Sequence, residues 1–330
     1  MTDADNTNSA EKWVSYRSDL EVLDCTIRDG GLMNDHQFDD ETVRAVYETC
    51  VAAGIDYMEI GYMNSPKQFP REDFGPWKHS AEEDLRRIVG ENNTALKLSV
   101  MADAEKCEYE EQFLPAGESV IDMIRVATYI HQIPTALEML RVAKERGYET
   151  CCNIMALSTL REPELREGLE LVVQSGIKAI CIVDSFGALY REQIDYYYDL
   201  YHSYAEPHGV AVGIHAHNNL QLGFANTVEA IIKGAGVADA TMAGLGRGAG
   251  NCPMELLMGF LHNPKYHHRP VIECVSNVIE PMRESLKWGF DLPYMMTAIL
   301  NRHPRAAMIF KDSDESGDVV GFYDRMLDGT

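Results

Sequence analysis

The sequence lacks any long apolar run, since no stretch approaches the roughly 18 residues that a membrane-spanning helix needs. Its first residues also lack the basic start and apolar core of a secretory signal peptide. We therefore predict a cytoplasmic protein that does not use a membrane as a partner. Residues 1–19 are expected to form a polar N-terminal tail.

Basic residues are scarce in this chain. Its 330 residues include 29 lysines and arginines against 52 aspartates and glutamates, which gives a formal net charge of −23. A field of that sign repels nucleic acid and anionic membranes, so we exclude nucleic acid as a partner. It also repels small anions, and any anionic substrate therefore needs positive groups close to its site.

The eight cysteines include no C-x-x-C pair. This spacing excludes a zinc ribbon, and a chain that is 45% hydrophobic can bury a core without a disulfide framework. We predict that the cysteines are reduced and mostly buried.

Short β-rich runs alternate with amphipathic helical patterns along most of the chain. The eight runs occupy 21–29, 56–62, 95–103, 123–129, 149–158, 179–187, 210–218 and 239–247. The clearest helical patterns, each closed by a glycine, occupy 39–54, 133–147, 160–176 and 219–236. Eight strands with intervening helices in about 250 residues predict an α/β fold of the (β/α)8 TIM-barrel type.

The barrel is expected over residues 20–264. A doubly wound sheet is the alternative fold, but TIRDGGLMND at the first turn is not the Gly-rich fingerprint of that fold. Residues 265–330 indicate a short C-terminal helical extension with an acidic tail. No Gly/Ser-rich or Pro-rich linker precedes this extension, so we expect it to pack on the barrel.

Two histidines lie one residue apart in the run VAVGIHAHN. Because side chains alternate along a strand, His215 and His217 share one face, and the apolar Val212 and Ile214 share the other. The apolar face suits the helical layer, which points the histidines into the barrel at its C-terminal end, where barrel active sites lie. A lone histidine there would usually be structural, but two on one inward face favour a metal site.

A third ligand is expected from the end of another strand. Asp29 ends the first run, two strands away from the histidines around a closed barrel. One carboxylate and two imidazoles suit Mn²⁺, Mg²⁺, Co²⁺, Zn²⁺ or Fe²⁺. Taken alone, Asp29 is as consistent with a helix cap or a turn. The neighbouring Arg28 could stabilise an enolate oxygen beside the metal, or could simply pair with the acidic rim.

Further candidates lie at other strand ends and in the Gly-rich loop 243–253. Gly246 in this loop could bring the backbone close to a ligand, and Asn251 could either face the metal or cap a helix. We assign Arg125 and Ser185, with Arg28 and Gly246, to substrate binding. Asp184, at the end of its strand, is a candidate for catalysis.

The runs DCTIRDG, HAHNN and GLGRGAGN together resemble the DRE-TIM metallolyase superfamily, the HMGL-like barrels, and most of all its 4-hydroxy-2-oxovalerate aldolase-type members. The resemblance implies that Asp29, His215 and His217 bind a divalent metal, with Mn²⁺ ahead of Mg²⁺, Co²⁺ or Zn²⁺. It places Asn251 near the metal and Arg28 at the enolate. It also implies a 2-oxo acid and an aldehyde or ketone as substrates, a homodimer, and by family analogy a partner dehydrogenase.

One departure from the aldolases concerns proton transfer. These enzymes carry a catalytic histidine three residues after the motif aspartate, and this chain has Leu32 there. The replacement base is sought among His36, Asp184, Tyr294 and His303. For both histidines an ordinary surface position is at least as consistent with the sequence.

We therefore predict a class II, metal-dependent carbon–carbon lyase of the aldolase type that acts through a pyruvate-like enolate. The first alternative is a Claisen-type acyltransferase that joins an acyl-CoA to a 2-oxo acid. A second alternative is a non-catalytic barrel that binds a metal and a ligand. A non-haem iron oxygenase uses the same ligand types and is the least favoured alternative.

Overall fold

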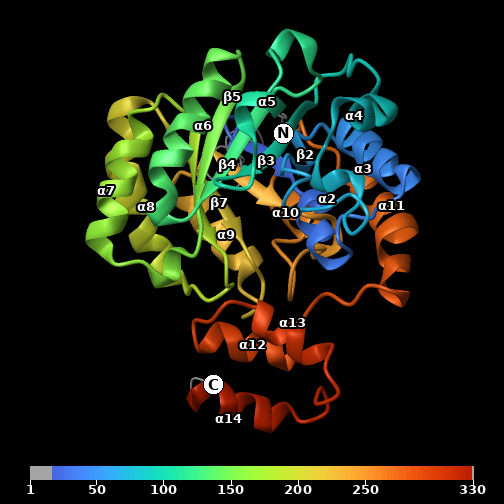
Figure 1. Ribbon diagram of the computed structural model, residues 1–330, viewed down its shortest axis with the longest axis vertical. Helices are drawn as coiled ribbons and strands as arrows, with labels where there is room; N and C mark the ends of the chain where they lie inside the picture. Colours follow the sequence, from blue (N-terminus) through green and yellow to red (C-terminus); the bar gives the residue numbers. More distant parts are fainter. Residues whose placement is uncertain (1–16, 329–330) are drawn as a thin grey trace, which may run out of the picture.

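The computed structural model describes residues 17–328, so most of the expected N-terminal tail lies outside the described residues. Eight parallel strands close into a barrel in the order β1 to β8 (Figure 1). The strands are β1 (Glu21–Asp24), β2 (Tyr57–Tyr62), β3 (Lys97–Asp103), β4 (Met123–Thr128), β5 (Glu149–Ile154), β6 (Ala179–Asp184), β7 (Ala211–Ala216) and β8 (Val237–Ala240). The predicted TIM barrel is confirmed.

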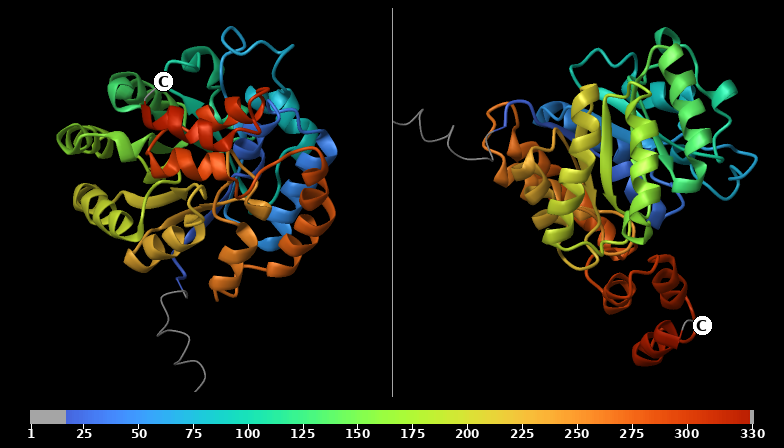
Figure 2. Two further views of the ribbon diagram at one scale, coloured as in Figure 1. Left: turned by 90° about the horizontal axis from the view of Figure 1, so that it is seen from below. Right: turned by 90° about the vertical axis from the view of Figure 1, so that its left-hand side faces the viewer.

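A layer of helices surrounds the strands (Figure 2). It contains α3 (Asp40–Ala53), α4 (Glu82–Val89), α5 (Tyr109–Gln112), α6 (Ile133–Glu145), α7 (Glu162–Val173), α8 (Arg191–Ala205), α9 (Gly223–Lys233), α10 (Met254–Phe260) and α11 (His268–Cys274). The boundaries follow the expected signals: the side chain of Asp39 caps α3 by accepting from the Thr42 N–H, and Gly54 ends it at φ 71°.

The first strand is shorter than predicted. It ends at Asp24, because this carboxylate accepts hydrogen bonds from the backbone N–H and the hydroxyl of Thr26, at 3.0 and 2.6 Å. The chain then forms one helical turn, α2 (Thr26–Gly30). Asp29 therefore reaches the C-terminal rim of the barrel from a helical turn and not from a strand.

The alternation expected for β7 is present. Val212, Ile214 and Ala216 belong to the main core between the strands and the helices. Gly213 faces the opposite way, since a Cβ there would lie 2.7 Å from the Cys181 sulfur inside the barrel. His215 follows on this inward face, and the strand thus presents the histidine motif to the barrel interior.

Three helices, α12 (Leu292–Ile299), α13 (Arg305–Lys311) and α14 (Val319–Asp328), form a small extension. Figure 1 places them beyond one end of the barrel, next to loops that follow its last strands. They have their own apolar cluster around Tyr294, Phe310 and Phe322. The extension contacts the rim through hydrogen bonds such as that from Asn301 to the Ser158 carbonyl, at 2.8 Å. The domain boundary at residue 265 stays a prediction.

All eight cysteines are buried and free, as predicted. None of the helices in the described part of the chain combines the length and the apolar character that crossing a membrane requires.

Candidate active site

Asp29, His215 and His217 come together at the C-terminal rim of the barrel. His215 lies near the end of β7, and His217 follows the strand in an isolated bridge with Asn251. The Nε2 atoms of His215 and His217 lie 3.2 and 3.8 Å from Oδ2 of Asp29. Potential ligand atoms of these three residues all lie within 4.8 Å of one another. This compact set of two nitrogens and one oxygen fits a divalent cation.

The amide of Asn251 supports the same interpretation. Both polar atoms of this buried side chain lack a hydrogen-bond partner among the described residues. A Cβ at Gly246 would lie 2.5 Å from its Nδ2 and 3.1 Å from Oδ1 of Asp29, so the Gly-rich loop passes close to both side chains. A buried amide without a partner is costly, and a cation or its bound ligand would satisfy it.

Beneath the rim, six buried side chains form a closed arrangement that we call the charge ring. In order around it they are Asp29, Arg28, Glu59, Arg125, Asp239 and His215. Adjacent members are 2.6 to 3.3 Å apart. Each carboxylate has two positive or ionisable neighbours, which offsets the cost of burying it.

The charge ring sets the protonation of the candidate metal ligands. Burial alone would raise the pKa of Asp29, but Arg28 and the two histidines hold that pKa well below its usual range. Burial lowers the pKa of His217 far below its ordinary value, so its imidazole is neutral. For His215 the burial effect is outweighed by hydrogen bonds to Asp239 and Asp29, and its pKa is raised.

A narrow cavity of about 50 Å³ opens beside these residues. Its polar wall consists of Arg28, Asp29, Asn153, Ser185, His215, His217 and Arg247. Its apolar wall includes Leu32, Tyr62, Met101, Ala127 and Met155, which pack as one cluster. Nη2 of Arg28 is buried and finds no hydrogen-bond partner within residues 17–328. The cavity therefore offers a free guanidinium donor next to the candidate metal site.

Ser185 and Asp184 are adjacent in sequence but occupy different surroundings. Ser185 lines the cavity, and its hydroxyl accepts a hydrogen bond from the Ala156 N–H. The carboxylate of Asp184 instead accepts from the N–H groups of Ala188 and Leu189, behind the cavity wall. Burial raises the pKa of Asp184 to about 6 against these bonds. Its contacts indicate that it holds the turn after β6.

Arg125 lies in the barrel interior and not at the cavity. Its side chain is 1% exposed, and its guanidinium pairs with Asp239 at 2.7 Å and Glu59 at 3.3 Å. Arg125 does not line the narrow cavity, and its guanidinium pairs within the charge ring, so the predicted substrate-binding role stays a prediction.

The remaining candidate bases do not line the cavity either. His36 is buried behind it, with its ring edge against Tyr62 and a pKa held well below its usual range by burial. Tyr294 and His303 belong to the extension region, and His303 packs against Phe186. Leu32, at the position of the aldolase histidine, does line the cavity.

The residues of the site that were missed from the sequence include Glu59, Tyr62, Asp239 and Arg247. Glu59 and Asp239 complete the charge ring, and Tyr62 and Arg247 line the cavity. The one available signal was an acidic residue in an otherwise apolar strand, as in YMEIGY for Glu59. A buried acid in such a run needs a partner, but the sequence does not show which.

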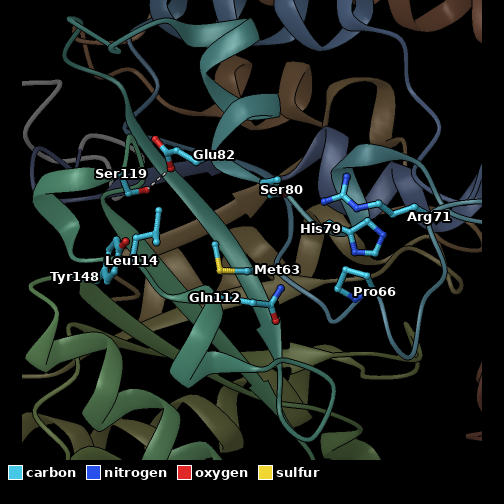
Figure 3. A pocket seen from close by; sticks show the side chains of 11 residues that line it. Met63, Pro66, Arg71, His79, Ser80, Glu82, Gln112, Leu114, Ser119 and Tyr148 are labelled. Carbon is cyan, nitrogen blue, oxygen red and sulfur yellow. Dashed lines mark hydrogen bonds between the residues drawn. The ribbon is translucent and has the colours of Figure 1, made fainter.

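A separate cavity of about 300 Å³ lies between the loop after β2 and the segment that contains Gln112, Leu114 and Ser119 (Figure 3). It shares no lining residue with the narrow cavity. The larger size of this cavity does not make it the reaction site, because the convergent carboxylate, histidines and arginines lie elsewhere.

Comparisons with known proteins agree with this geometry. The family model described as HMGL-like matches residues 19–275. The chain is 33% identical to a 4-hydroxy-2-oxovalerate aldolase from Thermus thermophilus, over 79% of this chain and 75% of that protein. It is 31% identical to an oxaloacetate decarboxylase from Mycobacterium tuberculosis, over 73% of this chain and 69% of that protein.

Solved structures show the same architecture. The N-terminal domain of a putative aldolase from Bacteroides vulgatus superposes with a TM-score of 0.78 at 30% identity, over 91% of this chain and 99% of that one. A hydroxymethylglutaryl-CoA lyase from Pseudomonas aeruginosa gives a TM-score of 0.66 at 18% identity, over 82% and 96% of the two chains. Because its sequence identity is only 18%, the second match supports the fold alone.

Proposed function

Because the chain belongs to the HMGL-like family, we propose that it is a divalent-metal-dependent lyase that cleaves or forms a carbon–carbon bond next to a 2-oxo acid. The observation that carries the proposal is the free Nη2 of Arg28 beside the Asp29–His215–His217 cluster. Relatives named as an aldolase and as a decarboxylase both break such a bond, which supports the class of reaction.

Asp29, His215 and His217 would hold the metal, with Asn251 next to them. When bound, a divalent ion supplies Lewis acidity to the oxygens of a 2-oxo acid. Mn²⁺ is our first choice, with Mg²⁺, Co²⁺ and Zn²⁺ as alternatives, because one carboxylate and two imidazoles accept all of them.

Arg28 has a defined part in this mechanism. Its Nε is bound to Glu59 and its Nη1 to Asp29, which fixes the guanidinium plane and leaves Nη2 available to a ligand. Nη2 donates a hydrogen bond to the enolate oxygen as negative charge develops there during bond cleavage. The bond electrons move onto the 2-oxo acid fragment, and a proton must then reach C3.

We assign this proton transfer to Tyr62. It lies at the end of β2 in the apolar cavity wall and packs with Leu32, the residue at the position of the aldolase histidine. Burial raises the pKa of Tyr62 above its usual range, so its hydroxyl is protonated at rest and can donate to C3. The tyrosinate left behind takes a proton from solvent, and the reverse of the same step removes a proton from C3 of pyruvate. This role replaces the earlier candidates, which do not line the cavity.

Hydrogen exchange at C3 of pyruvate tests the proposal independently of the second substrate. We expect Mn²⁺-dependent loss of the pyruvate methyl proton signal in D₂O by nuclear magnetic resonance. Asp29→Asn should abolish the exchange, and Tyr62→Phe should slow it by roughly 10²-fold or more. Absence of exchange in the wild-type protein, with pyruvate shown to be bound, would reject an enolate mechanism and favour a non-catalytic barrel.

Release of free thiol from an acyl-CoA in the presence of a 2-oxo acid would distinguish a Claisen-type acyltransferase from the proposed lyase. An aldehyde or ketone as second substrate, a homodimer and a partner dehydrogenase stay predictions.

A further inference from the structure

Arg247 is held at the cavity by the Gly-rich loop that follows β8. Its backbone N–H donates to Oδ1 of Asp29 at 3.1 Å, and its Nη2 donates to the Ser185 carbonyl at 2.9 Å. Gly246 has no room for a Cβ against Asn251, and Gly248 has a φ of 68°, which favours glycine. The loop and these two hydrogen bonds therefore hold the Arg247 side chain in the wall of the cavity.

The guanidinium of Arg247 differs from its two neighbours in having no counter-ion. Arg28 and Arg125 each pair with two carboxylates of the charge ring. Arg247 forms no ion pair with any carboxylate in the described part of the chain, and its Nε is buried without a hydrogen-bond partner. A guanidinium without a counter-ion, with one buried and unbonded N–H in a cavity wall, is matched by an anionic group of a ligand.

The charges around the cavity point to the same conclusion. The three carboxylates of the charge ring balance the guanidinium groups of Arg28, Arg125 and Arg247. A bound divalent cation, with both histidines neutral as its ligands, would add two positive charges to these groups. A second carboxylate on the ligand would offset more of this charge than a methyl group at the same position.

The two ends of the ligand would then have different partners. In the proposed function, the 2-oxo acid end of the ligand would lie beside Asp29, His215 and His217, and Arg28 would take the enolate oxygen. We infer that Arg247 binds a second carboxylate, so that the substrate is a compact 2-oxo dicarboxylic acid; this inference rests on the proposed function. The cavity is narrow, and the apolar side chains of Leu32, Tyr62 and Met101 in its wall would pack against a short carbon skeleton.

Binding of matched acids to the Mn²⁺-loaded protein tests the inference by isothermal titration calorimetry. Oxaloacetate, freshly dissolved and kept cold, is compared with 2-oxobutyrate, and 2-oxoglutarate with 2-oxopentanoate. Within each pair the chain length is constant and only the terminal group changes from methyl to carboxylate. We expect the dicarboxylate of at least the shorter pair to bind roughly 10–100-fold more tightly.

Arg247→Met should remove this preference and leave the affinity for 2-oxobutyrate unchanged. Arg247→Lys keeps the charge without the planar fork and should retain part of the preference, which guards against misfolding of the methionine variant. Arg269→Met, on the exposed face of α11, removes one positive charge far from the cavity lining and should leave both affinities unchanged.

The outcomes separate the two proposals. Equal binding of the mono- and dicarboxylates, unaffected by Arg247→Met, would overturn the role of Arg247 and leave the lyase proposal intact. If no 2-oxo acid binds the Mn²⁺-loaded protein, both proposals fail. Loss of 2-oxobutyrate binding in Arg247→Met would assign Arg247 to the first carboxylate and overturn the dicarboxylate inference.

Discussion

Nδ1 of His215 lies 2.9 Å from Oδ2 of Asp239, on the side of the ring away from the candidate metal site. When His215 binds a metal, the carboxylate would accept the Nδ1 proton, and Nε2, which faces Asp29, would be the unprotonated ligand atom. A carboxylate behind a ligating histidine fixes the tautomer and the ring orientation and increases the basicity of the ligand.

Replacing Asp239 should therefore weaken metal binding although this residue is not a ligand. We expect Asp239→Asn to lower the affinity for Mn²⁺ by roughly 10–100-fold, measured by titration calorimetry. Asp199→Asn on the outside of α8, where Asp199 pairs only with Lys233, is the matched control. Unchanged Mn²⁺ affinity in Asp239→Asn would remove His215 from the ligand set or Asp239 from its support.

Replacing Arg125 should show whether the charge ring stabilises the fold. Arg125→Met leaves Glu59 and Asp239 each with one partner fewer in the barrel interior, and we expect a loss of about 3–5 kcal/mol in the free energy of unfolding. Urea unfolding in the presence of a chelator measures this loss without the metal. Arg269→Met, which breaks an exposed pair with Glu273, should change stability by less than about 1 kcal/mol. A stable Arg125→Met protein with a raised KM would instead support the substrate-binding role.

The Arg28→Lys variant should show whether the mechanism needs the planar guanidinium or only its positive charge. Lysine keeps the positive charge but cannot contact Glu59, Asp29 and an enolate oxygen together, as the three nitrogens of Arg28 can. We expect kcat to fall by roughly 10²-fold or more, with the metal content retained in elemental analysis. A turnover close to that of the wild-type enzyme would exclude Arg28 from the mechanism.

His303 should make the protein sensitive to mild acid. Burial and the nearby Arg247 and Arg305 lower its pKa to about 4. The unfolded chain binds the proton near pH ~6.5 and the folded chain does not, so stability falls as the pH drops from about 6.5 to about 4. The Arg305 N–H donates to Nδ1 of His303, a bond that protonation would break.

After allowing for screening of this partly exposed ring, we expect His303 to account for about 1–2 kcal/mol of the loss in that range. His303→Gln keeps an acceptor but does not titrate, and its urea midpoint should fall less steeply with pH. Parallel pH profiles for the two proteins would show that His303 does not contribute.

The sequence was sufficient for the barrel and for the histidine pair, because both follow from local periodicity. Alternating Val212 and Ile214 fixed the outer face of β7 and therefore the inward direction of His215 and His217. The partners of the buried charges could not be predicted in this way. Glu59 and Arg125 meet across β2, β3 and β4, and their approach depends on strand register, which local patterns do not give.

Local propensity also misplaced a boundary that matters for the site. Residues 21–29 were predicted as one strand, but the hydrogen bonds of Asp24 to Thr26 end β1 and start the turn of α2. This turn directs Arg28 and Asp29 toward different partners, although they are adjacent. A strand would have placed them on opposite faces of the sheet.

The closure of the charge ring has a consequence for how this barrel can diverge. Every member has a neighbour on each side, so a change at one position leaves two others with an unbalanced charge. Substitution one residue at a time is therefore costly, while a paired exchange such as the loss of an arginine together with its carboxylate preserves neutrality. We expect sequences descended from a common ancestor with this chain to vary at Glu59, Arg125 and Asp239 jointly and seldom singly.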